Sequence, residues 1–338
     1  MRSEIRIDLG ALRRNARTLL RALDGSELWA VVKANGYGHG AADCAGAALA
    51  AGASAVCVAT VREALALRRA LPDARLLVLG PAGEAELADA RDARLELTVS
   101  GGPLPEGIDL HLKLDTGMGR WGASELVTPT RGVVGVMTHL ATADGDAAFA
   151  QRQLERFRTA TDGLDGLTRH AANSAAALGV PESRLDAARC GIALYGLSPF
   201  GTDPGADGLE PVLSWRSEIA LTRLLRAGES TGYGRRFVAA RDTWIGIVPV
   251  GYADGFRRDL TGTEVVVGGE RRRAIGTVSM DAFAVELDRE LRPGTPVTIV
   301  GDGILLEEHA RAAGTITYEL ACGIDPSPLR AERAVVEG

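Results

Sequence analysis

Short apolar runs alternate with longer Ala-, Leu- and Arg-rich stretches over the first 200 residues. The short runs have the composition of strands buried on both faces, and the longer stretches repeat apolar residues at helical spacing. Eight runs qualify as strands, and they cover residues 28–33, 55–60, 75–80, 95–100, 109–115, 132–139, 169–173 and 187–192. Eight strands separated by helices predict an α/β fold, a (β/α)₈ TIM-type barrel. A doubly wound open sheet is the alternative that this pattern leaves open.

The connections between the predicted strands are unequal in length. Stretches of helical period cover residues 11–23, 41–51, 61–70, 84–91 and 147–160. Residues 101–108 and 121–131 have room for barely a turn or two of helix each. We therefore expect the barrel to be irregular or trimmed beside its fifth and sixth strands.

The pattern changes after Leu197, where the segment SPFGTDPGADGLEP is rich in turn-forming residues. Such a segment is typical of a domain boundary. We predict a barrel domain over residues 1–205 and a mainly β domain over residues 206–338. Strand-like runs in the second domain cover residues 214–225, 243–250, 264–267, 270–277, 282–287 and 296–300. Residues 306–313 and a turn near Tyr318 are its predicted helical parts.

Composition excludes several functional classes. The net charge is −6 with acids and bases interspersed, so the chain has no basic stripe for nucleic acid and no polybasic tract for a membrane. No apolar run reaches the roughly 18 residues of a spanning helix, and the charged start lacks the apolar core of a signal peptide. We expect a cytoplasmic protein. The four cysteines are far apart without a CxxC pair, so buried thiols are favoured over disulfides or zinc ligands.

Lysine is almost absent from this chain. Lys33 and Lys113 are its two lysines, and the other 36 of its 38 basic residues are arginines. Arginine keeps its proton under all ordinary conditions, whereas a desolvated lysine can become a free amine that attacks a carbonyl or forms a Schiff base. The two lysines are therefore candidates for chemistry that arginine cannot perform.

Both lysines are placed where a barrel puts its functional residues, near the ends of strands. Lys33 ends the first strand within VVKANGYGHG, a glycine-containing loop in which backbone N–H groups can approach an anion. The other polar residues in or just after predicted strands are Lys113, Arg120, His139, Asn173, Ser174 and Arg189.

These residues fall within segments that resemble the alanine racemase family along nearly the whole chain. The segments, in order, are VVKANGYGHG, HLKLDTGMGRWG, THLATAD, ANSAA, ARCGIALYG, GYGRRF, VPVGYADGF, GTVSMD and TITYELAC. The resemblance implies a fold-type III pyridoxal 5′-phosphate (PLP) enzyme that interconverts L-alanine and D-alanine for peptidoglycan precursors. It also implies a homodimer whose active sites take residues from the partner's β domain.

The resemblance assigns the two proton-transferring groups. Lys33 matches the lysine that binds PLP as a Schiff base and acts on one face of the substrate, and Tyr233 matches a tyrosine from the partner subunit that acts on the other face. A tyrosine with a pKa of about 10 is a poor base near neutral pH unless positive neighbours stabilise its phenolate. We expect His139 and Arg120 to be those neighbours.

Further residues match positions that bind the cofactor. Arg189 matches the arginine that donates to the pyridine nitrogen, and because a guanidinium cannot accept a proton, the ring nitrogen stays unprotonated. That should favour racemisation over transamination. The remaining cofactor-binding residues by resemblance are Tyr37, His139, Asn173, Ser174, Gly191, Ile192 and Tyr318, of which most form a phosphate cradle without a dedicated lysine.

The substrate-binding set follows from the same resemblance. Arg120 is expected near the substrate carboxylate, and Lys113 is expected to orient Arg120. In several relatives the lysine at the position of Lys113 is carbamylated. We hypothesise that Lys113 is carbamylated here. Met280 and Asp281 match a segment whose backbone contacts the carboxylate, Tyr252 matches a residue at the entrance, and Arg258 matches one beside it.

Two segments depart from the family pattern. The stretch between Arg120 and His139 is shorter than expected, and the ending DPSPLRAERAVVEG replaces a basic one. Both departures put the dimer surface and the substrate range in doubt. A racemase of serine or another small amino acid and a non-catalytic PLP-binding protein remain alternatives. A barrel-type amino-acid decarboxylase is disfavoured, because its cysteine-bearing catalytic segment is not recognisable.

Overall fold

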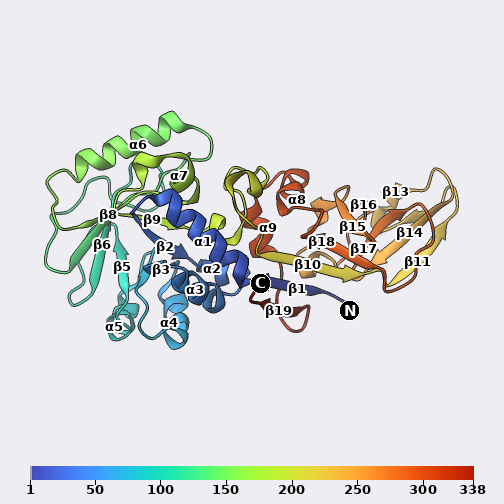
Figure 1. The fold of residues 1–338 in the computed structure, drawn as a ribbon, viewed down its shortest axis with the longest axis horizontal. Helices are drawn as coiled ribbons and strands as arrows, with labels where there is room; N and C mark the ends of the chain where they lie inside the picture. Colours follow the sequence, from blue (N-terminus) through green and yellow to red (C-terminus); the bar gives the residue numbers. More distant parts are fainter. Residues whose placement is uncertain (1) are drawn as a thin grey trace. The chain divides into compact units, whose positions relative to one another are not determined.

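The computed structural model describes residues 2–338, which form two compact units. The barrel unit comprises residues 11–200 and 204–210, and the β unit comprises residues 2–10, 201–203 and 211–338. Figure 1 colours the chain along its sequence, and blue residues of the β unit therefore mark the start of the chain. The predicted boundary at residue 205 places residues 2–10 in the barrel domain. The strand that these residues form pairs instead with strands of the β unit.

Eight parallel strands close the barrel, which confirms the predicted fold class and excludes the open sheet. Their bounds are β2 (Glu27–Val31), β3 (Ala55–Val58), β4 (Leu76–Val78), β5 (Glu96–Val99), β6 (Asp109–Lys113), β7 (Val133–Met137), β8 (Thr168–His170) and β9 (Ala187–Cys190). β2 pairs with β9 to complete the ring, with Trp29 opposite Arg189. Every residue of β3 and β4 is buried, as expected for strands covered on both faces.

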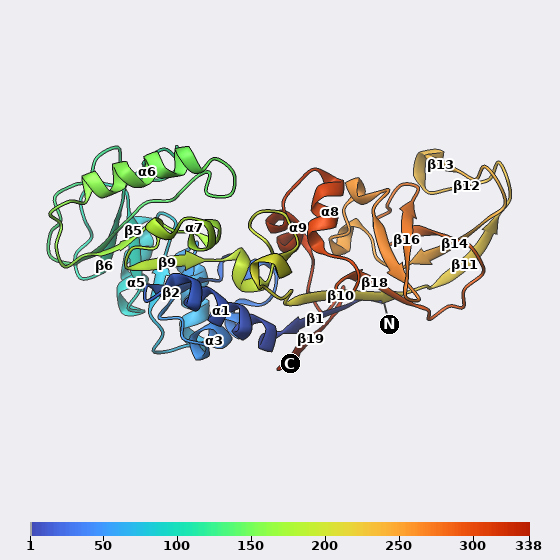
Figure 2. The same cartoon turned by 45° about the horizontal axis from the view of Figure 1, so that its top comes forward.

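Helices cover the outside of much of the barrel (Figure 2). They are α1 (Leu9–Leu23), α3 (Ala41–Ala50), α4 (Val61–Ala70), α5 (Leu87–Asp92), α6 (Ala147–Ala160) and α7 (Ser174–Gly179). Local chemistry sets where they begin: the Asp146 side chain accepts a hydrogen bond of 3.0 Å from the Phe149 N–H and so caps α6. Within residues 2–338, no helix combines the length and the apolar character needed to cross a membrane.

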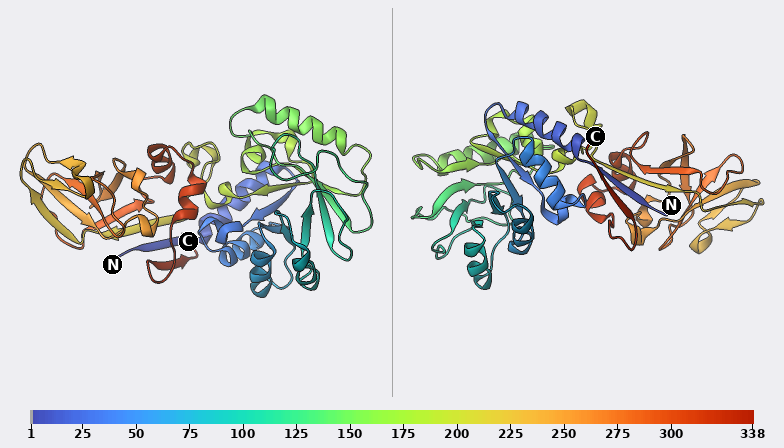
Figure 3. Two further views of the ribbon diagram at one scale, coloured as in Figure 1. Left: turned by 180° about the vertical axis from the view of Figure 1, so that it is seen from behind. Right: turned by 60° about the horizontal axis from the view of Figure 1, so that its bottom comes forward.

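The barrel is trimmed on one side. Residues 100–108 and 114–132, all of which the structure describes, contain no helix. The segment around β6 and β7 is accordingly drawn as strands and loops (Figure 3). The cramped connections therefore leave the outer faces of these strands without the helical cover that the rest of the barrel has.

The β unit is built on a nine-stranded sheet in the order β11-β14-β17-β16-β15-β18-β10-β1-β19. Its strands are β1 (Glu4–Asp8), β10 (Leu213–Glu218), β11 (Leu221–Leu225), β14 (Thr243–Val248), β15 (Glu264–Val267), β16 (Glu270–Ile275), β17 (Phe283–Leu287), β18 (Pro296–Val300) and β19 (Glu332–Val336). A separate pair joins β12 (Ser230–Thr231) to β13 (Phe237–Val238), and the unit's helices are α8 (Leu306–Ala313) and α9 (Thr317–Gly323).

Two features of this sheet differ from the sequence-based expectation. The single strand expected over residues 214–225 is divided, because Ile219 and Ala220 form hydrogen bonds to Thr295 and Ile247 and turn the chain from one part of the sheet to another. β1 and β19 were not expected. In β1 the buried Ile5 and Ile7 alternate with charged residues, which is the pattern of a strand with one buried face.

The cysteines are only partly as expected. Cys44, Cys57 and Cys190 are buried, whereas Cys322, on α9, is exposed. None of the four forms a disulfide among the described residues. Burial raises the pKa of the Cys57 and Cys190 thiols to about 12, so both remain protonated and act as small apolar side chains.

Candidate active site at the barrel rim

The segment that carries Lys33 has a left-handed backbone. α2 (Lys33–Tyr37) directly follows β2 and contains a run of positive φ angles. The residues and their φ angles are Ala34 (52°), Asn35 (53°), Gly36 (64°) and Tyr37 (52°). This conformation costs an L-residue about 1–2 kcal/mol, a cost from which only the glycine is exempt. Such strain is retained mainly where function requires a fixed geometry.

The side chain of Glu63 fixes the start of this left-handed turn. Its carboxylate accepts hydrogen bonds from the backbone N–H groups of Ala34 at 2.7 Å, Ala59 at 2.7 Å and Thr60 at 3.2 Å. The Thr60 hydroxyl accepts in return from the Glu63 N–H, which forms a capping box at the start of α4. One carboxylate therefore joins the ends of β2 and β3 at the rim beside Lys33.

A cradle of neutral donors lies close to the same turn. The N–H groups of Gly191 and Ala193 converge on the Ser174 hydroxyl, at 2.9 and 3.3 Å. A Cβ at Gly191 would lie 2.3 Å from the Tyr37 hydroxyl, so glycine is what allows the phenol to reach this place. Ile192 lies between the two N–H donors in sequence. Tyr37, Ser174, Gly191 and Ile192 are thus brought together, and aligned neutral donors of this kind suit a phosphate.

Arg189 is buried beneath the rim with uncharged partners. Its guanidinium donates to the carbonyl oxygens of Thr138 at 2.7 Å, His170 at 2.9 Å and Ala171 at 3.2 Å. It also contacts Nδ1 of His170 at 2.7 Å and Nδ1 of His139 at 3.4 Å. Burial lowers the pKa of Arg189 to about 10, so the side chain still carries its charge at neutral pH. A ligand at this place meets a charged group that can only donate.

His139 is held neutral, which corrects one expectation. Burial, followed by the charges of Arg189, Lys113 and Arg120, holds the pKa of His139 well below its usual range. A neutral imidazole cannot supply the positive charge that was expected to favour a phenolate. A neutral His139 can orient a neighbouring hydroxyl, and Arg120 is the remaining candidate for a cation that favours a phenolate.

Lys113 and Arg120 share one aromatic neighbour. The Lys113 Nζ lies 5.7 Å from the centre of the Trp121 ring, and the Arg120 guanidinium lies 5.2 Å from it. Lys113 is only 5% exposed. Burial, with help from Arg189 and Arg120, lowers the pKa of Lys113 to about 8. Roughly a tenth of the Lys113 side chains are therefore free amines at pH 7, far more than for an ordinary lysine.

Asn173 has a clear architectural role at the rim. Its Oδ1 accepts from the Ala176 N–H at 3.0 Å and caps α7, while its Nδ2 donates to the Leu140 carbonyl at 3.3 Å. These bonds hold Ser174 at the first position of α7, next to the cradle. A direct role of Asn173 toward a cofactor stays a prediction.

The remaining candidates lie in the β unit, where three of them cluster around residues 276–281. The Tyr252 N–H donates to the Ser279 carbonyl at 3.0 Å, and the Tyr233 carbonyl accepts from the Thr277 hydroxyl at 2.8 Å. The side chains of Tyr233, Tyr252 and Met280 are 73%, 41% and 53% exposed. Three large side chains around one loop thus face solvent in the isolated chain, an arrangement typical of an interaction surface.

Three further residues were carried over from the resemblance to the β unit. Asp281 forms an ion pair of 2.9 Å with Arg330, so its side chain is engaged within the β unit. Tyr318 lies half-buried on α9, and Arg258 is exposed in a short 3₁₀ turn.

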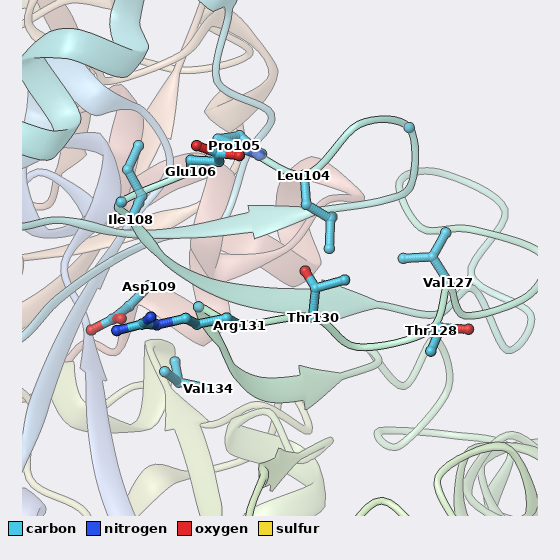
Figure 4. Close-up of a pocket in the computed structure, with 13 residues that line it drawn as sticks. Leu104, Pro105, Glu106, Ile108, Asp109, Val127, Thr128, Thr130, Arg131 and Val134 are labelled. Atoms are coloured by element: carbon cyan, nitrogen blue, oxygen red, sulfur yellow. The ribbon is translucent and has the colours of Figure 1, made fainter.

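A wide hollow of the barrel unit lies away from these residues. It has a volume of about 1010 Å³ and is lined by Leu104, Ile108 and Val134, with polar residues that include Asp109 and Arg131 (Figure 4). Asp109 and Val134 lie at the starts of β6 and β7, whereas the catalytic candidates follow strand ends. The hollow therefore marks the missing helical cover, and it does not belong to the candidate active site.

Glu63 and a buried pair of histidines, His111 and His170, were not expected at the site. Glu63 was detectable, since Thr60 and Glu63 have capping-box spacing before a helical stretch. The histidines carried no comparable signal. Side-chain alternation places a strand residue inside or outside a barrel, but does not show which residue of another strand it meets.

Comparisons with known proteins agree with this architecture. The sequence model of the alanine racemase N-terminal domain matches residues 7–199, and that of the C-terminal domain matches residues 212–332. Alanine racemase 1 of Bacillus subtilis is 40% identical over 350 residues, which cover 94% of this chain and 90% of that protein. Alanine racemase of Lactiplantibacillus plantarum is 40% identical over 358 residues, covering 96% of both.

Solved structures give the same result. The biosynthetic alanine racemase from Pseudomonas aeruginosa superposes with a TM-score of 0.92 at 36% identity and full coverage of both chains. The alanine racemase from Bacillus anthracis with bound L-Ala-P has a TM-score of 0.87 at 32% identity, covering 100% of this chain and 95% of that one. The barrel followed by a mainly β unit is thus the architecture of a class of isomerases, the amino-acid racemases to which these relatives belong. The chain belongs to the alanine racemase family.

Proposed function

We propose that the protein uses PLP to interconvert L-alanine and D-alanine in the cytoplasm and so supplies D-alanine for peptidoglycan precursors. The observation that carries this proposal is the combination at the barrel rim. A strained turn bearing Lys33, a cradle of neutral donors and the buried, donor-only Arg189 occur on neighbouring strand ends. PLP offers a matching aldehyde, phosphate and ring nitrogen.

The donor chemistry of the rim fits this cofactor. The hydroxyls of Tyr37 and Ser174 and the N–H groups near Gly191 would bind the phosphate, and Tyr318 is proposed to add one more hydroxyl. The guanidinium of Arg189 would donate to the ring nitrogen, because it has no lone pair to offer. When bound, PLP supplies an electron-withdrawing system that acidifies the Cα proton of an attached amino acid.

Two groups of the chain would move the proton. The Lys33 amine takes or returns it on one face of Cα, and the Tyr233 hydroxyl does so on the other. His139, held neutral, would orient the tyrosine hydroxyl, while Arg120 would bind the substrate carboxylate and favour the phenolate. The backbone at Met280 and Asp281 would complete the carboxylate site, and Tyr252 would line its entrance.

We further propose that the active protein is a homodimer with shared active sites. The exposed cluster of Tyr233, Tyr252 and Met280 would insert into the partner's barrel, which would bury these side chains. The contribution of a residue from each chain to one site makes dimerisation a requirement for catalysis.

The substrate and the reaction can be tested with the PLP-loaded protein in D₂O. We expect exchange of the α-hydrogen of alanine together with loss of optical activity, as measured by NMR and chiral chromatography. Serine and larger amino acids, assayed in parallel, would define the range. Normal PLP binding without α-hydrogen exchange for any amino acid would reject racemisation and favour a non-catalytic PLP-binding protein.

Mixing two inactive variants tests the shared site. In a heterodimer of Lys33→Ala and Tyr233→Phe chains, one of the two sites has both groups intact. After equal mixing and subunit exchange we expect about a quarter of the wild-type activity, because half of the dimers are heterodimers with one complete site each. If both groups came from the same chain, no mixture would regain activity.

A further inference from the structure

The charge of Arg189 lacks a direct counterion. The side chain is buried, with 3% of its surface exposed, and among residues 2–338 no carboxylate lies within 4 Å of its guanidinium. Buried charges are costly and are usually paired. A carboxylate is nevertheless connected to Arg189 through two other side chains.

A line of hydrogen bonds crosses the barrel interior from Arg189 to Glu96. The Arg189 Nη1 lies 2.7 Å from Nδ1 of His170, whose Nε2 lies 2.8 Å from Nδ1 of His111. The Nε2 of His111 lies 2.8 Å from Oε2 of Glu96. Oε1 of Glu96 accepts from the Arg75 Nε at 2.5 Å. We call this series of four hydrogen bonds, which runs from Arg189 through Glu96 to Arg75, the Arg189–Glu96 line. Glu96 begins β5, so the line ends at the side of the barrel opposite to the rim.

Trp29 and Gly135 shape the space around the two imidazoles of the line. The Trp29 ring contacts both imidazoles, with centroids 4.5 Å from His170 and 5.6 Å from His111. A Cβ at Gly135 of β7 would lie 2.3 Å from Nδ1 of His111, so only glycine leaves room for this ring. Trp29, His111 and His170 are all fully buried. The two imidazoles are therefore shielded from water, and each of their nitrogens depends on the partner that the protein supplies.

The two ends of the line determine where its protons lie. Arg189 can only donate, so Nδ1 of His170 must accept and the proton of a neutral His170 must be on Nε2. That proton is donated to Nδ1 of His111, whose own proton is then on Nε2 and is donated to Glu96. Burial, followed by the charge of Arg189, holds the pKa of His170 well below its usual range. Burial also lowers the pKa of His111, although its hydrogen bond to Glu96 opposes this. Both rings are therefore neutral.

The opposite proton arrangement would disturb Arg189. If His111 carried its proton on Nδ1, His170 would have to accept on Nε2 and carry its own proton on Nδ1, directly against the Arg189 N–H. Two donors 2.7 Å apart repel, and a buried donor without an acceptor is costly. An ionised carboxylate at the far end excludes this arrangement because it can only accept. Burial alone would raise the pKa of Glu96, but the bonds from His111 and Arg75 outweigh it and lower that pKa.

We propose that Glu96 is a positioning residue that sets the tautomers of His111 and His170 and thereby keeps Arg189 as a donor toward the cofactor's ring nitrogen. The tautomer assignment concerns the chain alone. The final step, toward the ring nitrogen, rests on the proposed function.

The substitution Glu96→Gln separates the charge of this side chain from its shape. A glutamine has one accepting oxygen, and the charged Arg75 takes it in preference to the neutral His111. The amide NH₂ then faces Nε2 of His111, which must accept, and both imidazole protons move to Nδ1. Glu27→Gln is the matched control. Glu27 lies 3.7 Å from Arg75 at the same side of the barrel, but it contacts neither histidine of the line.

The tautomers are measured in the cofactor-free protein by NMR of ¹⁵N-labelled histidine, with assignment by single substitution of the five histidines of the chain. We expect protonated Nε2 in both His111 and His170 in the wild type and in Glu27→Gln. We expect protonated Nδ1 in both in Glu96→Gln. Protonated Nδ1 in the wild type would overturn the proposal without any variant, and so would an unchanged pattern in Glu96→Gln.

A second measurement addresses Arg189 itself. We expect Glu96→Gln to weaken PLP binding about tenfold, the effect of one lost hydrogen bond, as measured by the cofactor's absorbance. Glu96→Asp keeps the carboxylate and should restore the wild-type tautomers and most of the affinity. Equal affinity in wild type and Glu96→Gln, despite changed tautomers, would refute the link to Arg189. If the wild type bound no PLP, the proposed function would fail while the tautomer assignment stood.

Discussion

The carboxylate of Glu63 lies 2.7 Å from the backbone nitrogen of Ala34, 29 residues earlier in the chain. Ala34 is the first left-handed residue after Lys33, and the same carboxylate accepts from the N–H groups that precede α4. The helix cap of one βα unit thus stabilises the strained turn of the preceding one. A charged acceptor forms stronger hydrogen bonds than a neutral one, which helps to offset the cost of the left-handed backbone.

Replacing Glu63 by glutamine should loosen the turn that carries Lys33. The variant keeps one accepting oxygen and places its NH₂ against backbone N–H donors, so we expect a loss of about 1–3 kcal/mol in the free energy of unfolding. The exchange of the Ala34 amide with solvent should also accelerate. Urea unfolding and hydrogen exchange check the two effects. Glu86→Gln is the control, because Glu86 caps the Gly83 N–H at an exposed 3₁₀ turn. Similar hydrogen exchange at Ala34 in both variants would contradict the anchoring role.

Tyr233→Phe should separate activity from stability. The Tyr233 side chain is 73% exposed, so removal of its hydroxyl should change the free energy of unfolding by less than about 0.5 kcal/mol. Racemisation should fall about 10²- to 10⁴-fold if the hydroxyl transfers the proton on one face. Tyr195→Phe gives the opposite pattern, because its buried hydroxyl donates to the Val31 carbonyl at 3.0 Å. An active Tyr233→Phe enzyme would remove this residue from the mechanism.

The unmodified Lys113 makes the stability of the cofactor-free protein depend on pH. Burial, then Arg189 and Arg120, lowers its pKa from 10.5 to about 8 in the folded state. Between pH 8 and 10.5 the unfolded chain binds the additional proton, so stability rises with pH in this window, and the protonated amine destabilises fully below pH 8. Relative to Lys113→Met, the wild type should gain about 3 kcal/mol between pH 7.5 and 10.5. Parallel urea curves at all pH values would contradict the lowered pKa.

Carbamylation of Lys113 is a separate expectation with its own measurement. The free amine attacks the carbon of CO₂, which is in equilibrium with bicarbonate, and releases one proton, so that Lys113 gains a carboxylate. The yield should increase as the pH rises through about 8, because only the unprotonated amine reacts. The resulting anion would replace a cation beside Arg120 at the Trp121 ring. Native mass spectrometry detects the added mass, and Lys113→Arg is the control because a guanidinium does not react. An unmodified Lys113 at every pH would reject the hypothesis.

Much of the barrel could be predicted because each of its strands leaves a local signal. The observed β3 (Ala55–Val58) lies within the predicted run 55–60, and α4 and α6 begin and end where their period does. β1 was missed because its two buried isoleucines form too short an alternation to be distinguished from a charged loop. Its partners, β10 and β19, lie more than 200 residues away and leave no local trace.

The chemistry of the site was predictable only where a residue acts alone. Lys33 was identified by its amine and its place after a strand, without reference to its neighbours. The neutrality of His139 depends instead on Arg189, Lys113 and Arg120, which three different segments of the chain bring near it. The contact between His111 and His170 likewise depends on the register of three barrel strands, β6 to β8, which a single sequence does not specify.

The pairing of β1 also governs the order of events during synthesis. β1 leaves the ribosome about 200 residues before β10, and at roughly 5–20 residues per second its partner arrives some 10–40 seconds later. The last barrel strand, β9, emerges only shortly before β10, so the barrel is incomplete for most of that interval, and Ile5 and Ile7 remain without a sheet. The nascent chain thus carries an unpaired, half-apolar strand ahead of an incomplete barrel, and this is the period in which chaperone binding would matter most.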